Sequence, residues 1–279
     1  MYQSTFDYRL YIWILTQFFK FIFILRLLLY QKKHRMKDNF SKQAVEYSKF
    51  RPEYPDAMID YVVTFVKDKT AALDIATGNG QVANTLSKHF ELVYATDISD
   101  NQLQNAVQAD NIIYKKEPAE KTSFDNQQFD LITVAQGIHW FSFDDFYKEI
   151  YRILKPEGYF AVLGYSLFST NASSDRIIRH FYHTIISPYW DKERVYLDED
   201  YKTIPFPFNE VAVENFHNNF TWTFEQLIGY LTTWSATQHY ITKNNQNPID
   251  LIYNDLKKSW EMNDKKVHFP LLLRIGTMK

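Results

Sequence analysis

The chain has 279 residues, of which 46% are hydrophobic and 23% are charged, so it can form one large α/β domain with a sizeable core. Its formal net charge of −2 argues against binding of nucleic acid through a basic surface. The absence of cysteine excludes disulfides, a thiolate nucleophile and a cysteine-based zinc site. No other spacing of metal ligands is evident, so no metal is expected.

Residues 1–35 differ in composition from the rest of the chain. Residues 10–30 are mostly apolar and are interrupted by the charges of Lys20 and Arg26. A helix of about 20 apolar residues spans a bilayer, although two charges within it are costly. Alternatively, the natural protein begins at Met36, and a protein that starts there is expected to be soluble and active. We therefore expect either a membrane anchor through residues 10–30 or a cytoplasmic protein whose domain comprises residues 36–279.

A proline-containing segment precedes the first predicted strand. In residues 47–55, Pro52 and Pro55 favour an extended path for the aromatic and basic side chains of Tyr47, Arg51 and Tyr54. Apolar residues at helical spacing then predict a helix over residues 56–66.

A strand, a glycine turn and a helix are predicted in residues 71–90. The short apolar run 71–75 is typical of a buried parallel strand, and Gly78 and Gly80 follow it. This order places backbone N–H groups at the carboxyl end of the strand, where they bind an anionic or nucleoside-bearing ligand. The next predicted strand, 93–97, ends at Asp97, whose carboxylate could accept hydrogen bonds from both hydroxyls of a ribose. These features together predict a cofactor that contains adenosine.

Two classes of cofactor fit this pattern. Residues 78–83 match the dinucleotide fingerprint G-x-G-x-x-A. However, Asp74 stands four residues before the first glycine, and residues 74–80 resemble motif I of the class I S-adenosylmethionine-dependent methyltransferases, with Ala76 in place of the first glycine. The resemblance implies S-adenosylmethionine as the cofactor. The cofactor-binding residues that it implies in this part of the chain are Asp74, Ala76, Gly78, Gly80, Asp97 and Ile98.

Further resemblance to this family follows the next two predicted strands, 112–114 and 129–135. Residues 117–120 resemble the family's adenine-binding segment, which implies cofactor contacts for Ala119 and Glu120. Ligands of open α/β sheets bind at the carboxyl ends of the strands, where residues 136–141 lie. This stretch resembles a His-Trp-Phe run of the family. The resemblance implies cofactor binding by Gln136, catalysis by His139 and substrate binding by Trp140.

Two segments resemble a subgroup that includes trans-aconitate-type carboxyl methyltransferases. Residues 47–55 resemble the segment that lies over the cofactor in that subgroup, which implies substrate contacts for Tyr47, Arg51 and Tyr54. Residues 232–235 resemble a short signature of the same subgroup.

The family resemblance implies a Rossmann-like, doubly wound α/β sheet of seven strands with the last strand antiparallel. Residues 155–158 predict a turn before a fifth strand at 159–164, and residues 267–275 predict the final strand. Residues 166–240 are too long for a simple crossover, so we expect a helical cap there. Further helix is predicted at 224–240 and 249–260.

The function implied is methyl transfer from S-adenosylmethionine to a small molecule, with a carboxylate as one candidate acceptor. A carboxylate needs no general base, whereas a hydroxyl acceptor would use His139. Arg51 could pair with a substrate carboxylate. The alternatives are an NAD-dependent oxidoreductase, which would need a catalytic Tyr-x-x-x-Lys or a His–acid relay, and a non-catalytic, membrane-tethered binding protein, which would need residues 1–35.

Overall fold

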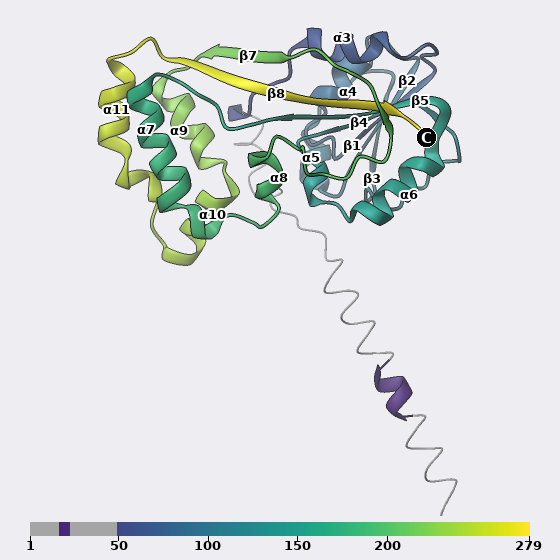
Figure 1. Cartoon of the computed structure of the whole chain (residues 1–279), viewed down its shortest axis with the longest axis horizontal. Coiled ribbons are helices and arrows are strands. Elements are labelled where there is room, and N and C mark those ends of the chain that lie inside the picture. The colour runs from purple at the N-terminus through teal and green to yellow at the C-terminus, as the bar shows by residue number, and fades with distance from the viewer. Residues whose placement is uncertain (1–16, 23–48) are drawn as a thin grey trace, which may run out of the picture. The chain divides into compact units, whose positions relative to one another are not determined.

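The computed structural model describes residues 17–22 and 49–279 (Figure 1). Residues 17–22 are helical and belong to a separate unit from the domain that contains residues 49–279. Across these described ranges no helix is both long and apolar enough to cross a membrane. Most of the predicted span 10–30, and Tyr47, lie outside the described residues.

A single sheet forms the centre of the domain. Its strands are β1 (Ala71–Ile75), β2 (Leu92–Asp97), β3 (Ile112–Lys116), β4 (Phe129–Ala135), β5 (Leu154–Tyr165), β6 (Asn209–Glu210), β7 (Phe216–Thr221) and β8 (Lys266–Thr277). The order is β3-β2-β1-β4-β5-β8-β6, with β7 also paired to β8. The first five strands are parallel, and β8 runs antiparallel to β5, as predicted for the last strand. The sheet has eight strands and not seven, because β6 and β7 pair with different stretches of β8.

Helices surround the sheet (Figure 1). The α-helices are α3 (Asp56–Thr64), α4 (Gln81–Leu86), α5 (Asp100–Gln104), α6 (Phe143–Ile153), α7 (Ala172–His180), α8 (Arg194–Asp198), α9 (Phe224–Thr232), α10 (Ser235–Asn244) and α11 (Tyr253–Glu261). Shorter helical turns are η2 (Ile138–Trp140), η3 (Phe181–Ile185), η4 (Ser187–Tyr189) and η5 (Pro248–Leu251).

Alternate residues of the strands build two cores, one on each face of the sheet. Leu73 of β1 belongs to the core that α6 covers, whereas its neighbour Ala72 belongs to the core that α3 and α4 cover. Ile132 and Leu131 of β4 divide between the two cores in the same way. This alternation follows from the two-residue period of a strand, and burial on both faces explains why β1 and β4 are apolar throughout.

The start of β5 differs from the predicted turn. Helix α6 ends at Ile153 and β5 begins directly at Leu154, so no separate turn lies between them. Phe129 of β4 pairs with Leu154, but Leu131 pairs with Tyr159. The extra residues of β5 at 155–158 therefore form a bulge, which the local sequence Lys-Pro-Glu-Gly accommodates.

A third core lies beyond the end of β5. It joins residues of α7, α9, α10 and α11 to Tyr165 of β5 and to Phe269 of β8. We call this helical layer the cap. Its helices continue to Glu261, and β6 and β7 lie within the range 166–240.

Candidate active site

The glycine turn after β1 is bonded directly to the end of β2. The backbone N–H of Gly78 donates to Oδ2 of Asp97 over 3.0 Å, and the N–H of Ser99 donates to Oδ1 over 2.9 Å. Because β1 and β2 are adjacent and parallel, their carboxyl ends lie together. The pairing of Gly78 with Asp97 shows that the predicted turn and the predicted carboxylate occupy one site.

The backbone of this turn is left-handed at three positions. Ala76, Gly78 and Gly80 have φ values of 54°, 56° and 80°. A side chain on Gly80 would place its Cβ 2.2 Å from the hydroxyl of Tyr114, so glycine is required there. Ala76 adopts a conformation that favours glycine, which explains why the related motif has glycine at its position.

The turns after β1 and β4 also approach closely. A Cβ on the buried Gly137 would lie 2.9 Å from Cβ of Ala76. The methyl group of Ala76 therefore occupies the space beside Gly137. The approach shows that the ends of β1, β2 and β4 form one surface.

Asp74 is buried just below this surface. Its carboxylate accepts hydrogen bonds from the hydroxyls of Thr77, over 2.6 Å, and Thr133, over 2.7 Å. Burial is the main reason that the pKa of Asp74 rises to about 6, and the charge of Asp97 adds to it, although the two hydroxyls act in the opposite direction. The hydrogen bonds from the two hydroxyls therefore do not fully offset the cost of burying the ionised carboxylate of Asp74.

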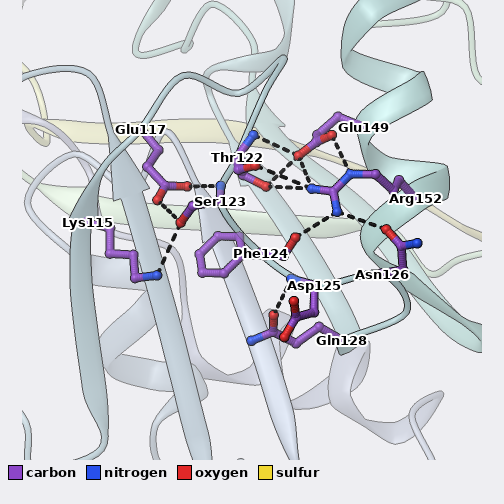
Figure 2. A network of polar contacts seen from close by, with 10 residues as sticks. All are labelled: Lys115, Glu117, Thr122, Ser123, Phe124, Asp125, Asn126, Gln128, Glu149 and Arg152. Carbon is purple, nitrogen blue, oxygen red and sulfur yellow. Dashed lines mark hydrogen bonds and ion pairs between the residues drawn. The ribbon is translucent and has the colours of Figure 1, made fainter.

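The predicted adenine-binding segment lies in a braced loop after β3 (Figure 2). Glu149 of α6 accepts hydrogen bonds from the backbone N–H of Thr122, over 2.7 Å, and from Arg152. Arg152 also donates to the carbonyl of Phe124 over 2.7 Å. Burial by itself would raise the pKa of Glu149, but the hydrogen bonds from Arg152 and Thr122 lower it below its ordinary value, so the carboxylate stays charged and holds the loop.

Within that loop, the two residues of interest differ in exposure. Ala119 is buried, and Glu120 is partly exposed and accepts the N–H of Ser142 over 3.0 Å. Ile98, after β2, is half-buried. The adenine role of these three residues stays a prediction.

A small cavity lies between the end of β4 and the cap. It is lined by Arg51, Gln136, His139, Trp140, Trp190, Asp191, Arg194, Leu197, Trp234 and Ser235. Four of the predicted site residues, from the segment before α3 and from the end of β4, therefore meet here. Gln136 faces this cavity, and its side chain is bonded to the backbone of Tyr165 and to the hydroxyl of Tyr201.

His139 is buried in η2 at the wall of this cavity. Its Nδ1 lies 3.1 Å from the hydroxyl of Tyr201, and its ring packs against Trp140. Burial, together with a smaller effect of the nearby charge of Arg194, lowers the pKa of His139 to about 3. His139 is therefore neutral at neutral pH.

Arg51 connects the segment before α3 to the cap. Its guanidinium donates to the hydroxyl of Tyr165 over 3.2 Å and to the carbonyl of Thr233 over 3.0 Å, and it lies over the ring of Tyr230. Tyr54 lies elsewhere, in a cleft that α3 and α4 line, with its ring 6.0 Å from that of Tyr165. The structure thus places Arg51 and Trp140 together but not Tyr54.

Three residues of the site were not predicted from the sequence. Trp190 and Arg194 line the cavity and Tyr201 contacts His139, but all three belong to a stretch without a recognisable motif, and only their aromatic and basic character marks them. Trp234 belongs to the segment 232–235, which carried the subgroup resemblance. Helix α8 packs against η2, and this contact brings residues that are distant in the sequence close to His139.

The spacing Tyr-x-x-x-Lys, which an oxidoreductase would need, does occur in the chain. Tyr151 and Lys155 form one such pair, but the hydroxyl of Tyr151 donates to the carbonyl of Pro207, and Lys155 pairs with Asp130 at the opposite, amino end of the sheet. Tyr253 and Lys257 form another pair on α11, where Nζ of Lys257 lies 5.9 Å from the centre of the Tyr253 ring. Neither pair lines the cavity.

No group of side chains within residues 17–22 and 49–279 has the composition and proximity of a metal site.

Comparison with known proteins identifies the family. Residues 73–162 match the family model described as a methyltransferase domain. The chain is 31% identical over 245 residues to a protein from Dictyostelium discoideum whose name assigns it to the methyltransferases, and this match covers 85% of the chain and 93% of the relative. A solved structure from Anaeromyxobacter dehalogenans, described as a type II methyltransferase, has 30% sequence identity and a TM-score of 0.74, and covers 82% of this chain and 98% of that one.

A shorter match carries the name of the cofactor. A Saccharomyces cerevisiae protein named as an S-adenosylmethionine-dependent methyltransferase is 26% identical over 132 residues, which are 44% of this chain and 45% of that protein. These relatives support neither the oxidoreductase nor the binding protein. With the fold and the motif I turn described above, they show that the chain belongs to the class I S-adenosylmethionine-dependent methyltransferases.

Proposed function

We propose that the protein transfers a methyl group from S-adenosylmethionine to a small molecule that carries a carboxylate. The observation on which this rests is the meeting of two sites at the carboxyl ends of the strands. One is the turn bonded to Asp97, and the other is the cavity beside His139.

The turn fits the cofactor chemically. The oxygens of Asp97 accept the backbone N–H groups of Gly78 and Ser99, which hold the carboxylate in place, and a carboxylate at the end of this strand is the group that binds the hydroxyls of a ribose. Ala76, Gly78 and Gly80 add no side chain larger than a methyl group, which leaves the backbone approachable. Glu120 and Ala119 would face the adenine.

Asp74 fits the other end of the cofactor. Its burial disfavours the ionised form, and a nearby ligand ammonium would offset that cost. When bound, S-adenosylmethionine supplies a methyl group that its sulfonium has already activated. The residues of this chain therefore have to align the acceptor and exclude water.

The cavity favours an acidic substrate. Arg51 and Arg194 line the cavity with two guanidinium groups, beside the carboxylate of Asp191, and Nε of Arg194 also pairs with Asp198 over 3.3 Å. Neutral His139 adds no charge, and the indole rings of Trp140, Trp190 and Trp234 exclude water. A carboxylate held between guanidinium groups gains charge-assisted hydrogen bonds in a partly desolvated site.

The subgroup of trans-aconitate-type carboxyl methyltransferases is part of the proposal. Its two signature segments, residues 47–55 and 232–235, contact each other through the hydrogen bond from Arg51 to Thr233. A carboxylate acceptor needs no base. A hydroxyl acceptor on the same molecule would place its hydrogen toward His139.

The test is transfer of a labelled methyl group to a panel of small mono-, di- and tricarboxylic acids, with the matching amides as controls. We expect label in the acids only, and mild alkaline release of labelled methanol would identify an ester. Arg51→Gln should raise KM for the acid, whereas the matched Arg176→Gln, on the exposed face of α7, should not. Equal labelling of acids and amides would contradict the proposed carboxylate acceptor. If no acceptor received a methyl group from S-adenosylmethionine, the proposed methyl transfer itself would be wrong.

A further inference from the structure

Tyr201 reaches His139 from a backbone that side chains rarely adopt. Asp200 and Tyr201, just after α8, are both left-handed, with φ values of 53° and 58°. Such conformations cost of order 1–3 kcal/mol each and persist where the surroundings hold them. Tyr201 is completely buried.

Two hydrogen bonds hold this backbone, and a glycine leaves room for the side chain of Tyr201. The hydroxyl of Ser166 donates to the carboxylate of Asp200 over 2.5 Å, and Arg274 of β8 donates to the carbonyl of Tyr201 over 3.1 Å. A Cβ on Gly164 would lie 2.5 Å from the ring of Tyr201, so the glycine in β5 makes room for that ring. Residues from three parts of the chain thus fix the position of the Tyr201 hydroxyl beside His139.

Hydrogen bonds to the backbone fix the orientation of the Gln136 amide. Its Nε2 donates to the carbonyl of Tyr165 over 3.2 Å, and its Oε1 accepts the N–H of Tyr165 over 3.3 Å. In the reversed amide, the NH₂ group would face the N–H of Tyr165 and the oxygen would face the carbonyl of Tyr165, so both hydrogen bonds would be lost. The atom that lies 3.2 Å from the hydroxyl of Tyr201 is therefore Oε1, which can only accept.

The orientation of the Gln136 amide determines where the hydroxyl hydrogen of Tyr201 and the ring hydrogen of His139 lie. Tyr201 has one hydroxyl hydrogen, and Gln136 receives it. The oxygen of Tyr201 can then only accept from Nδ1 of His139, 3.1 Å away. Neutral His139 has one ring hydrogen, so Nε2 keeps a lone pair. Among the described residues nothing donates to or accepts from this Nε2.

We infer that Tyr201 is a positioning residue that holds His139 in the Nδ1–H tautomer and presents the Nε2 lone pair to the cavity. A substrate group that faces Nε2 must then carry a hydrogen, as a hydroxyl or an amine does. Beside the carboxylate that Arg51 and Arg194 hold, this selects a molecule with both an acid and a hydrogen-bond donor. This selection of the substrate rests on the proposed function, whereas the tautomer of His139 follows from hydrogen bonds within the protein.

Burial is the main reason that the ring stays neutral, and one nearby charge acts in the same direction. Arg194, Arg51 and Asp191 line the same cavity, and the effect of Arg194 on His139 opposes protonation. Within this environment His139 acts first as a fixed acceptor of a hydrogen bond.

The experiment is a long-range ¹H–¹⁵N correlation spectrum of the imidazole rings in the full chain at neutral pH, without ligand. The resonances of His139 are identified by their loss in His139→Gln. We expect the Nδ1–H tautomer to predominate in the wild type. Tyr201→Phe, which keeps the ring, should abolish this preference, and Gln136→Met, which frees the tyrosine to donate to Nδ1, should shift the ring towards Nε2–H.

Tyr147→Phe is the matched control, because this buried hydroxyl donates to the carbonyl of Pro205 and not to His139. An Nε2–H tautomer in the wild type would overturn the inference even if the variants failed to fold. An unchanged tautomer in folded Tyr201→Phe or Gln136→Met would also overturn it. The spectrum needs neither cofactor nor substrate, so loss of the proposed function and loss of the tautomer are distinguishable.

Discussion

The backbone N–H of Gly78 donates a 3.0 Å hydrogen bond to the carboxylate of Asp97. This contact joins the turn after β1 to the end of β2, and the N–H of Ser99 holds the other oxygen of the same carboxylate. The carboxylate is therefore fixed before any ligand arrives, which lowers the entropy cost of binding a ribose.

The close approach of Gly137 to Ala76 predicts a coupled pair of substitutions. Gly137→Ala should destabilise the protein by about 1–3 kcal/mol, because its Cβ would lie 2.9 Å from that of Ala76. In the background of Ala76→Gly the same substitution should cost much less, since the remaining neighbours lie at ordinary contact distances of 3.5 and 3.6 Å. Denaturant unfolding of the four proteins measures this. Additive losses would show that the two positions do not touch.

The raised pKa of Asp74 predicts how stability depends on pH. The folded protein holds this proton up to about pH 6, whereas the ordinary pKa of an aspartate is 3.8, so the stabilising contribution is present at low pH and is lost as the pH rises through 6. Asp74→Asn imitates the protonated form. Without ligand it should therefore be more stable than the wild type by roughly 1–3 kcal/mol at pH 8, and nearly equal to it at pH 4.

Thermal unfolding across this pH range measures the effect, and a stability difference that does not change with pH would contradict it. Saturating S-adenosylmethionine should narrow the difference at pH 8 if the ligand ammonium lies near the carboxylate of Asp74.

His139 should act on turnover and not on cofactor affinity. His139→Ala removes a group from the cavity but leaves the hydrogen bonds of Asp97 in place. In the proposed function His139 orients the substrate, and misplacing a reactant can cost about 10²-fold in rate, so kcat should fall by at least about tenfold, while the dissociation constant of S-adenosylmethionine should change by less than about threefold. Steady-state kinetics and calorimetry compare the two quantities. Weakened cofactor binding with unchanged kcat would move His139 to the cofactor site.

The part of the site that lies close together in the sequence was predictable. The buried run 71–75, the glycines and Asp97 follow local rules of strand, turn and strand end, and the structure joins them through Gly78. Strands β1 and β4 were predictable because burial on both faces requires apolar runs.

The rest depends on contacts between distant residues. Strand β7 has the sequence Phe-His-Asn-Asn-Phe-Thr, whose polarity hides its pairing with β8. Tyr201 meets His139 across 62 positions of sequence, on a left-handed backbone that no local pattern demands. The bulge at 155–158 is visible only when Phe129 and Leu131 are matched to their partners in β5.

Asp97 is the residue on which the identity of the cofactor depends most directly. Asp97→Asn removes the charge and replaces one acceptor oxygen by a donor, so hydrogen bonds that each contribute about 1.5–3 kcal/mol are weakened. Because this carboxylate also accepts the N–H groups of Gly78 and Ser99, the ligand-free variant should lose about 1 kcal/mol of stability. Binding must therefore be measured well below the unfolding temperature of both proteins.

Calorimetric titration of the wild type and Asp97→Asn with S-adenosylmethionine, its demethylated product and NAD tests the central claim. We expect the wild type to bind the first two and not NAD. The variant should bind both about ten- to a hundredfold more weakly, because both carry the same ribose. A wild-type protein that binds NAD and does not bind S-adenosylmethionine would contradict the methyltransferase assignment.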